Sequence, residues 1–246
     1  MARMKFMNTE IDNLTMQETL QAIDRLIQED KSAYVVTPNV DHIVQLETSK
    51  ELQAVYENAS LILTDGKPLL WIAKWYGTPI KEKISGSDLF PLLCDMAAKK
   101  GYKMFFLGAA EGVAAKAAEN LANKFKGLQV VGTYSPPFGF EKDHVEMDKI
   151  KSMIKETNPH ILIVGLGCPK QEKFMYHHCK ELGVPISFGL GASFDFEAGN
   201  IKRAPRWMSN HGLEWFFRIT QDPKRMAKRY LVDDRKILGL AIKYRK

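Results

Sequence analysis

Residues Ile161–Met175 read ILIVGLGCPKQEKFM, and this stretch decides the fold that the sequence predicts. Its first four residues are apolar and three of them are β-branched, which is typical of a short strand buried on both faces of a parallel sheet. Gly165 and Gly167 then allow the backbone to turn tightly, and Pro169 fixes φ where a helix can begin. Gln171 falls in the first helical turn, where free backbone N–H groups and the helix dipole favour an anionic ligand. We therefore expect a strand–loop–helix corner, the place where open α/β sheets bind ligands.

The residues after this turn decide between a ligand site and a plain turn. Glycines alone are more typical of a sharp turn that binds nothing. The polar trio Lys170, Gln171 and Glu172 follows the turn directly, and it favours a ligand site.

Apolar runs alternate with helical patterns along the rest of the chain. The expected strands span residues 33–36, 61–64, 103–107, 128–132, 161–164 and 185–188. Helices are expected after the capping-box patterns Thr15–Glu18 and Thr48–Glu51, over residues 69–76, 88–100 and 143–157, and in an alanine-rich stretch ending near residue 125. This alternation from residue 15 to 190 predicts an α/β fold, with a mostly parallel, Rossmann-like sheet and helices on both faces.

The charge of the chain is unevenly spread. Residues 200–246 hold 13 Lys and Arg against 4 Asp and Glu, whereas residues 1–199 hold 22 against 25. We therefore predict two parts, an α/β domain over residues 1–199 and a basic, helical C-terminal appendage over residues 200–246. Such a basic segment points toward nucleic acid, an anionic membrane surface or a phosphorylated substrate.

Aromatic residues alternate with arginines in this appendage. Leu213, Trp215, Phe216 and Phe217 form an apolar face at helical spacing, flanked by arginines. The pattern fits an amphipathic helix lying on an anionic interface. It fits equally well a C-terminal helix packed on the sheet, with its aromatics in the core and its arginines in solvent.

Several classes of protein are disfavoured by what the sequence lacks. No run approaches the ~18 apolar residues of a membrane span, and the start has no apolar segment typical of a secretory signal. Three cysteines without C-x-x-C spacing suit reduced thiols in a cytoplasm. Cys168 and Cys179 lie near His177 and His178, but adjacent histidines point to different faces of a helix, so we expect no metal site.

Polar side chains follow several of the expected strands at their carboxyl ends. Thr37 and Asn39 follow one strand, Asp65 follows the next, and Gln171 follows the strand of the opening stretch. If these strands are parallel, all four side chains line one rim of the sheet, where Asp65 is suitably placed for a general base. An isolated Asp-Gly is more often only a turn, but several polar groups converging from separate strands indicate a site.

The glycine patterns argue against the common nucleotide-binding enzymes. Gly165 and Gly167 begin a dinucleotide fingerprint, but Lys170 occupies its third glycine position. The spacing of Gly108 and Gly112 does not fit either, and the chain has no Walker lysine pattern. There is also no Asp-x-Asp to hold a divalent metal on a sugar diphosphate. Cationic side chains and backbone N–H groups would therefore have to neutralise such a ligand.

Eight segments together carry a specific pattern, in chain order Thr37–Asp41, Leu63–Pro68, Ile84–Leu89, Phe106–Gly108, Val164–Glu172, Gly191–Asp195, Lys202–Met208 and Gly212–Trp215. Through them the chain resembles the WecG/TagA/CpsF glycosyltransferases, glycosyltransferase family 26, over nearly its whole length. Its closest likeness is to the TagA branch of Gram-positive bacteria.

The resemblance implies a metal-independent, inverting transfer without a cofactor. N-acetylmannosamine would pass from UDP-N-acetylmannosamine to undecaprenyl-diphosphate-linked N-acetylglucosamine, which begins the wall teichoic acid linkage unit. The resemblance also implies that Asp65 is the base, in a pocket with the substrate-binding candidates Thr37, Asn39, Gly108, Gly167, Lys170 and Gln171.

The same resemblance gives the appendage a role. It implies docking on the inner face of the cell membrane, closure over the active site, and a cytoplasmic, peripheral and often oligomeric enzyme. Arg218 and Arg225 are the candidates to stabilise the departing UDP, which gains negative charge.

Two alternatives remain open at this point. Relatives in the family differ in donor sugar, and no motif in this sequence indicates which sugar stereochemistry is recognised. N-acetylmannosaminuronic acid or glucose therefore remain open as donors. From another class, a nucleic-acid-binding α/β protein would use the basic appendage and bind oligonucleotides in a salt-sensitive way, but it leaves the rim around Asp65 without a role. We expect no nucleic-acid partner.

Overall fold

Six parallel strands form the central sheet of the structure. The structure is a computed structural model that describes residues 3–245, apart from the side chains of residues 206, 210, 225 and 233. Every neighbouring pair in this sheet is parallel, as predicted. In spatial order the strands are β4 (Leu61–Ile62), β3 (Ala33–Val36), β8 (Ile186–Gly189), β7 (Ile161–Gly165), β5 (Lys103–Gly108) and β6 (Gln129–Tyr134).

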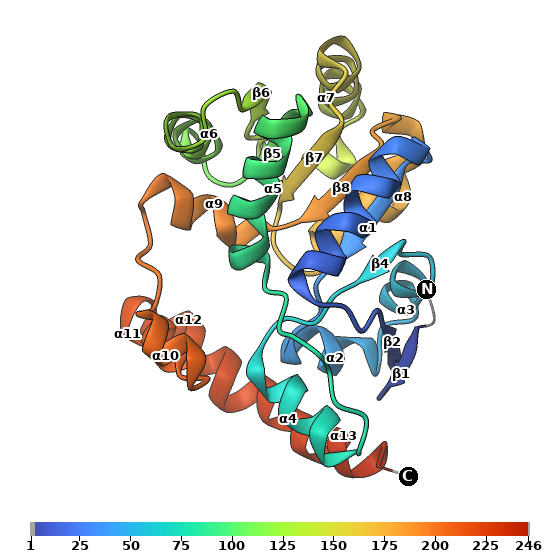
Figure 1. Cartoon of the computed structure of the whole chain (residues 1–246), viewed down its shortest axis with the longest axis vertical. Coiled ribbons are helices and arrows are strands. Elements are labelled where there is room, and N and C mark those ends of the chain that lie inside the picture. Colours follow the sequence, from blue (N-terminus) through green and yellow to red (C-terminus); the bar gives the residue numbers. More distant parts are fainter. Residues whose placement is uncertain (1–2, 246) are drawn as a thin grey trace.

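Helices cover both faces of the sheet because successive strand residues point to opposite sides (Figure 1). In β7, Leu162 and Val164 pack into one core, and Ile161 and Ile163 pack into the other. The first core includes α2 (Val40–Leu46), α3 (Lys50–Glu57), α7 (His144–Thr157) and α8 (Lys170–Leu182). The second includes α1 (Met16–Glu29), α5 (Gly86–Lys100), α6 (Val113–Lys124) and α9 (Gly191–Ala198). The predicted α/β architecture is thus confirmed.

The corner between β7 and α8 forms where the opening stretch predicts it. Gly167 has a φ of +77°, a conformation that favours glycine, and the peptide bond before Pro169 is cis. Gly165 lies so close to the neighbouring strand that a Cβ added at Gly108 would come within 2.5 Å of its carbonyl oxygen. Small residues are therefore needed where β5 and β7 end side by side.

The predictions from the sequence missed or misplaced several short elements. They gave no sign of the hairpin of β1 (Met4–Phe6) and β2 (Thr9–Ile11), because three-residue strands carry too little periodicity to detect. Helix α2 was missed because the third residue after its cap is a histidine, where a capping-box search looks for Glu or Gln. Helix α9 begins without a side-chain cap. Helix α3 is capped by Ser49, so the prediction that Thr48 caps it was wrong.

The C-terminal helices run across one end of the molecule, away from the sheet (Figure 1). They are α10 (Arg206–Asn210), α11 (Glu214–Gln221), α12 (Pro223–Lys228) and α13 (Ile237–Lys243), with a π-helical turn at 229–233 and a 3₁₀ turn at 234–236. The two turns and α13 pack on α2, and the Arg245 guanidinium lies 4.2 Å from the centre of the Trp75 ring at the end of α4 (Lys67–Trp75). The Tyr76 hydroxyl, just after α4, donates to the carbonyl of Ala241 at 2.6 Å. The appendage therefore does not pack on the sheet, which was one of the two arrangements that its sequence allows.

Candidate active site

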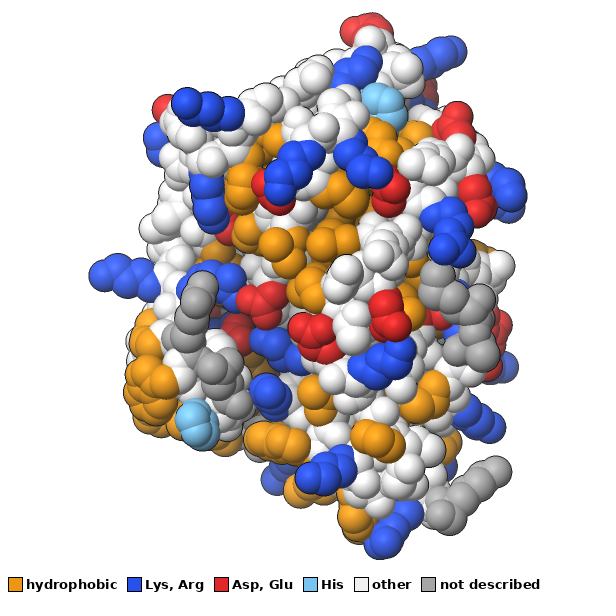
Figure 2. Space-filling view, in the orientation of Figure 1, with side chains coloured by type: hydrophobic (Ala, Val, Ile, Leu, Met, Phe, Trp, Pro, Cys, Tyr) orange, Lys and Arg blue, Asp and Glu red, His pale blue; other side chains and the backbone are white. Residues whose placement is uncertain are grey.

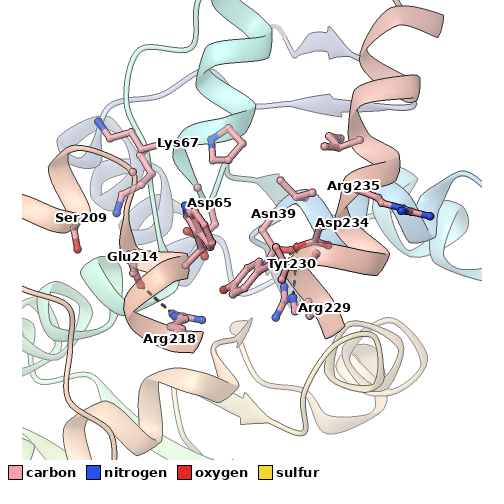
Figure 3. Close-up of a pocket in the computed structure, with 18 of the residues that line it drawn as sticks. Asn39, Asp65, Lys67, Ser209, Glu214, Arg218, Arg229, Tyr230, Asp234 and Arg235 are labelled. Atoms are coloured by element: carbon pink, nitrogen blue, oxygen red, sulfur yellow. Dashed lines mark hydrogen bonds and ion pairs between the residues drawn. The ribbon is translucent and has the colours of Figure 1, made fainter. Parts of the chain in front are cut away.

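Two cavities, of about 410 and 430 Å³, meet where β3 and β4 end. Four residues line both of them, namely Asn39, Asp65, Arg218 and Arg229. The cavity that we call the appendage cavity lies between α4 and the C-terminal helices, and its apolar lining comprises Val40, Pro68, Trp215, Tyr230, Leu231, Ile237 and Leu238 (Figure 3). The other, which we call the sheet cavity, lies over the ends of β3, β7 and β8, and its wall includes the glycines Gly165, Gly167, Gly189 and Gly191.

Asp65 lies where the two cavities join, in the connection between β4 and α4. Its backbone N–H donates to the carbonyl of Pro38 at 2.8 Å, which fixes it beside the end of β3. Burial raises the pKa of Asp65 from 3.8 to about 6, and the Glu214 carboxylate adds to the rise, whereas Arg218 and Lys83 oppose it. The carboxylate is therefore ionised at neutral pH, yet more basic than an ordinary aspartate, as a general base requires.

Thr37 and Asn39 follow β3 and bring polar atoms to the same place. The side chain of Thr37 is buried and lines the sheet cavity. The side chain of Asn39 caps α2, and its Oδ1 accepts a hydrogen bond from Arg229 Nη2 at 3.1 Å and lies 2.9 Å from Nδ1 of the His42 ring. Asn39 therefore links a residue of the appendage to the first turn of α2.

Gln171 lies in the first turn of α8, and its side chain is buried against the sheet cavity. Its Oε1 accepts from the backbone N–H of Gly191 at 3.3 Å, and its Nε2 donates to Glu172 at 2.9 Å. A Cβ added at Gly189 would lie 2.9 Å from Gln171 Nε2, so the amide fits only beside glycine. The structure thus brings all four residues of the expected rim to the wall of one cavity, namely Thr37, Asn39, Asp65 and Gln171.

Two arginines of the appendage reach this junction. Arg218 of α11 forms an ion pair with Glu214 at 3.1 Å and lines both cavities (Figure 3). Arg229 also lines both, and its guanidinium lies 3.5 Å from the Asp41 carboxylate. The side chain of Arg225, the other arginine expected at the diphosphate, is outside the described residues.

Arg229 is a site residue that the sequence analysis missed. It was recognised only as one of several arginines between the aromatics, because a sequence does not show which of them faces inward. The π-helical turn that begins at Arg229 changes the helical periodicity there, so regular spacing would not have singled it out.

Two of the expected substrate-binding residues lie elsewhere. Gly108 is not among the residues that line either cavity; it has a φ of +106° and contacts the end of β7, while its neighbour Ala109 lines the sheet cavity. Lys170 points to other partners, because its ammonium lies 3.0 Å from Glu141 and 4.5 Å from the centre of the Phe138 ring. Gly167, in contrast, lines the sheet cavity.

One group of potential metal ligands gathers within the described part of the chain. Side-chain atoms of His42, Cys168 and Glu172 lie within 4.8 Å of one another, an arrangement that the sequence analysis did not foresee. The grouping of Cys168 and Cys179 with His177 and His178, which the sequence analysis rejected as a metal site, does not include His42 or Glu172; His177 pairs with Glu51 on the surface at 3.1 Å. Both ring nitrogens of His42 contact side-chain oxygens of the protein, so this group is internally bonded.

Large apolar side chains are exposed on the C-terminal helices and on α4. Figure 2 shows them at the lower end of the molecule, among Lys and Arg side chains. They are Trp71, Trp75, Trp207, Leu213, Trp215, Phe216, Leu231, Val232, Leu238 and Ile242, each at least 37% exposed. Within the described residues, none of the helices has the length and apolar character needed to cross a membrane.

Comparison with known proteins bears on this site. The chain is 34% identical over 203 residues to a protein of Bacillus spizizenii, covering 82% of this chain and 76% of the relative. It is 30% identical over 202 residues to one of Bacillus subtilis, covering 82% and 77%, and 25% identical over 233 residues to one of Staphylococcus aureus, covering 92% and 88%. Each of the three is named N-acetylglucosaminyldiphosphoundecaprenol N-acetyl-beta-D-mannosaminyltransferase. The sequence profile of the WecG/TagA/CpsF glycosyl transferases matches residues 4–246, and the chain therefore belongs to this family.

Proposed function

We propose that this protein transfers N-acetylmannosamine from its UDP derivative to undecaprenyl-diphosphate-linked N-acetylglucosamine. The observation that carries the proposal is the meeting of two different cavities at one carboxylate, that of Asp65. A transferase for two large substrates needs two such spaces with a base between them. The names of the three relatives supply the sugar and the acceptor. The product would begin the linkage unit of wall teichoic acid.

The character of each cavity divides the two substrates between them. The sheet cavity has the glycine-rich wall at strand ends that suits a nucleotide, and we assign the UDP-sugar to it. The appendage cavity combines an apolar wall with Lys67, Lys83 and Arg235, which suits a lipid diphosphate. Thr37, Asn39 and Gln171 would then contact the UDP-sugar, which is the donor substrate.

The proposed reaction is a single displacement that inverts the sugar carbon. Asp65 takes the proton of the acceptor hydroxyl as its oxygen attacks the anomeric carbon of the donor. The bond from that carbon to the diphosphate breaks, and UDP leaves with additional negative charge. Arg218 and Arg229 are close enough to both cavities to stabilise this charge, and no metal is required for it.

The exposed apolar side chains suggest where the enzyme works. A lipid-linked acceptor stays in the membrane, so the opening of the appendage cavity has to face it. Leu231 and Leu238 line this cavity and are also 60% and 69% exposed. Apolar contact together with the basic charge of residues 200–246 would hold the protein peripherally on an anionic, cytoplasmic membrane face. Association into oligomers remains a prediction from the family resemblance.

A panel of UDP-sugars tests the function. Each sugar is incubated with a soluble, short-chain lipid-diphosphate N-acetylglucosamine, and the products are identified by mass spectrometry. We expect one added N-acetylhexosamine with UDP-N-acetylmannosamine and release of UDP. Transfer only from UDP-N-acetylmannosaminuronic acid or UDP-glucose would correct the donor, and no transfer from any of them would refute the proposal. Tight binding of oligonucleotides instead would favour the nucleic-acid alternative.

A further inference from the structure

A buried histidine connects the catalytic junction to α8. His42 lies in the first turn of α2 and is 4% exposed. Its Nδ1 is 2.9 Å from Asn39 Oδ1, and its Nε2 is 3.2 Å from Glu172 Oε1. The ring therefore bridges a residue that lines both cavities and a buried carboxylate of another helix.

The atoms around the ring show how it holds Asn39. Asn39 Oδ1 also receives the Arg229 guanidinium and the His42 backbone N–H, so this atom must be the amide oxygen, an acceptor. Glu172 Oε1 also accepts from Gln171 Nε2 at 2.9 Å. Nδ1 of His42 also accepts from the backbone N–H of Asn39 at 3.4 Å, so the ring is tied to the backbone and side chain of Asn39 at one nitrogen and to Glu172 at the other.

Burial and the neighbouring side chains act on the pKa of the ring in opposite directions. Glu172 is 1% exposed, and a carboxylate that deep in a protein needs a paired cation. Burial by itself disfavours a charged His42, but the neighbouring Cys168 and Glu172 outweigh it and hold the pKa of His42 well above its ordinary value. The other ionisable groups around the ring are Tyr56, whose ring centre is 6.3 Å away on α3, and Arg229 across Asn39.

These contacts also orient the amide of Asn39. With the Arg229 guanidinium and the His42 backbone N–H both donating to Oδ1, the Asn39 Nδ2 group is directed away from them, and no acceptor for it is found among the described residues. We propose that His42 and Glu172 are positioning residues that fix the Asn39 amide, so that its N–H groups donate to an oxygen of the nucleoside diphosphate at the junction of the cavities. The proposal rests on the function proposed above and extends it to two residues that do not react.

A double-mutant cycle tests this role. His42→Ala should lower kcat/KM for transfer about 10- to 100-fold, as expected for loss of a hydrogen bond that involves a charged group. The same change in an Asn39→Ala background should have little further effect, because the group that it positions is already gone. A purely structural role for His42 would give the same loss in both backgrounds, and that result would overturn the proposal.

The control is a second pair of a histidine and a glutamate, which joins α8 to α3. His177 also pairs with a glutamate, Glu51 at 3.1 Å, but it is exposed and lines neither cavity. His177→Ala should keep the wild-type kcat/KM. If no UDP-sugar is a substrate, the same cycle is measured on UDP affinity by calorimetry, so failure of the proposed function can be told from failure of this inference.

Glu172→Gln provides a second test that keeps the shape of the site. Because Nε2 of His42 then loses its anionic partner, the ring should hold Asn39 less firmly, and kcat/KM should fall about 10-fold. In an Asn39→Ala background the same change should have little effect. Equal losses in both backgrounds would contradict the positioning role of Glu172.

Discussion

Replacing Asp65 by asparagine should separate activity from stability. Asparagine keeps the shape of the side chain but accepts a proton poorly, so turnover should fall about 10²- to 10⁴-fold. Affinity for UDP should change little, because the proposed role of Asp65 is toward the acceptor hydroxyl. The wild-type activity should also decline as pH falls below about 6, where Asp65 becomes protonated.

The same change should stabilise the fold. The pKa of Asp65 rises from 3.8 to about 6 in the folded protein, so the folded state binds this proton more tightly than the unfolded chain. At about 1.4 kcal/mol per pH unit, the ionised carboxylate costs the fold about 3 kcal/mol above pH 6. This cost disappears as pH falls toward 4. Asparagine removes it, and the melting temperature at pH 7.5 should rise by several degrees.

The assay combines product formation on the soluble acceptor with thermal unfolding at pH 7.5 and pH 4.5. Asp95→Asn is the control, since Asp95 is a surface carboxylate of α5 paired with Lys99. Near-normal turnover of Asp65→Asn would refute the role of base. A melting temperature that falls at pH 7.5 would show that Asp65 stabilises the fold instead, and that its ionised form is not strained by burial.

Further predictions concern the arginines, the metal and the membrane. Arg218→Ala should lower kcat about 10- to 100-fold, because the positive charge at the departing diphosphate is lost. Arg218→Lys keeps a charge there and should retain part of the kcat. A wild-type kcat of the alanine variant would contradict this role. EDTA should leave turnover unchanged, since cationic side chains are proposed to serve the diphosphate, and recovery only with Mg²⁺ or Mn²⁺ would show a metal requirement. Trp207→Asp combined with Leu238→Asp should weaken sedimentation with anionic vesicles while turnover on the soluble acceptor is kept. High salt should weaken only the charged part of vesicle binding, and complete release by salt would argue against apolar insertion.

Much of the fold follows from the sequence because its strands are strongly apolar. Runs such as Ile161–Val164 are buried on both faces, and their order along the chain with helices between them predicts a parallel sheet. The rim was predictable for the same reason, because parallel strands end at one edge. Thr37, Asp65 and Gln171 could therefore be grouped without knowing the strand order.

What could not be predicted depends on packing between distant segments. The role of His42 requires Glu172 to lie next to it, and these residues are 130 positions apart. Arg229 is similar, because its place depends on how the appendage crosses α2 and where the π-helical turn falls. Lys170 shows the opposite error, since a cation just after a glycine turn suggests an anion site, but a nearby glutamate and an aromatic ring take up its charge.

The junction of the cavities joins the two parts of the chain in one site. Asn39 and Asp65 come from residues 1–199, the predicted α/β domain, whereas Arg218 and Arg229 come from residues 200–246, the predicted appendage. In the proposed reaction the base comes from one part and the charge stabilisation from the other, so neither part has the complete chemistry alone. The same appendage carries most of the exposed apolar side chains, and a membrane that holds the acceptor would contact this segment first. Membrane binding and catalysis would then depend on the same helices, and a truncated domain lacking residues 200–246 should lose turnover even on an acceptor that needs no membrane.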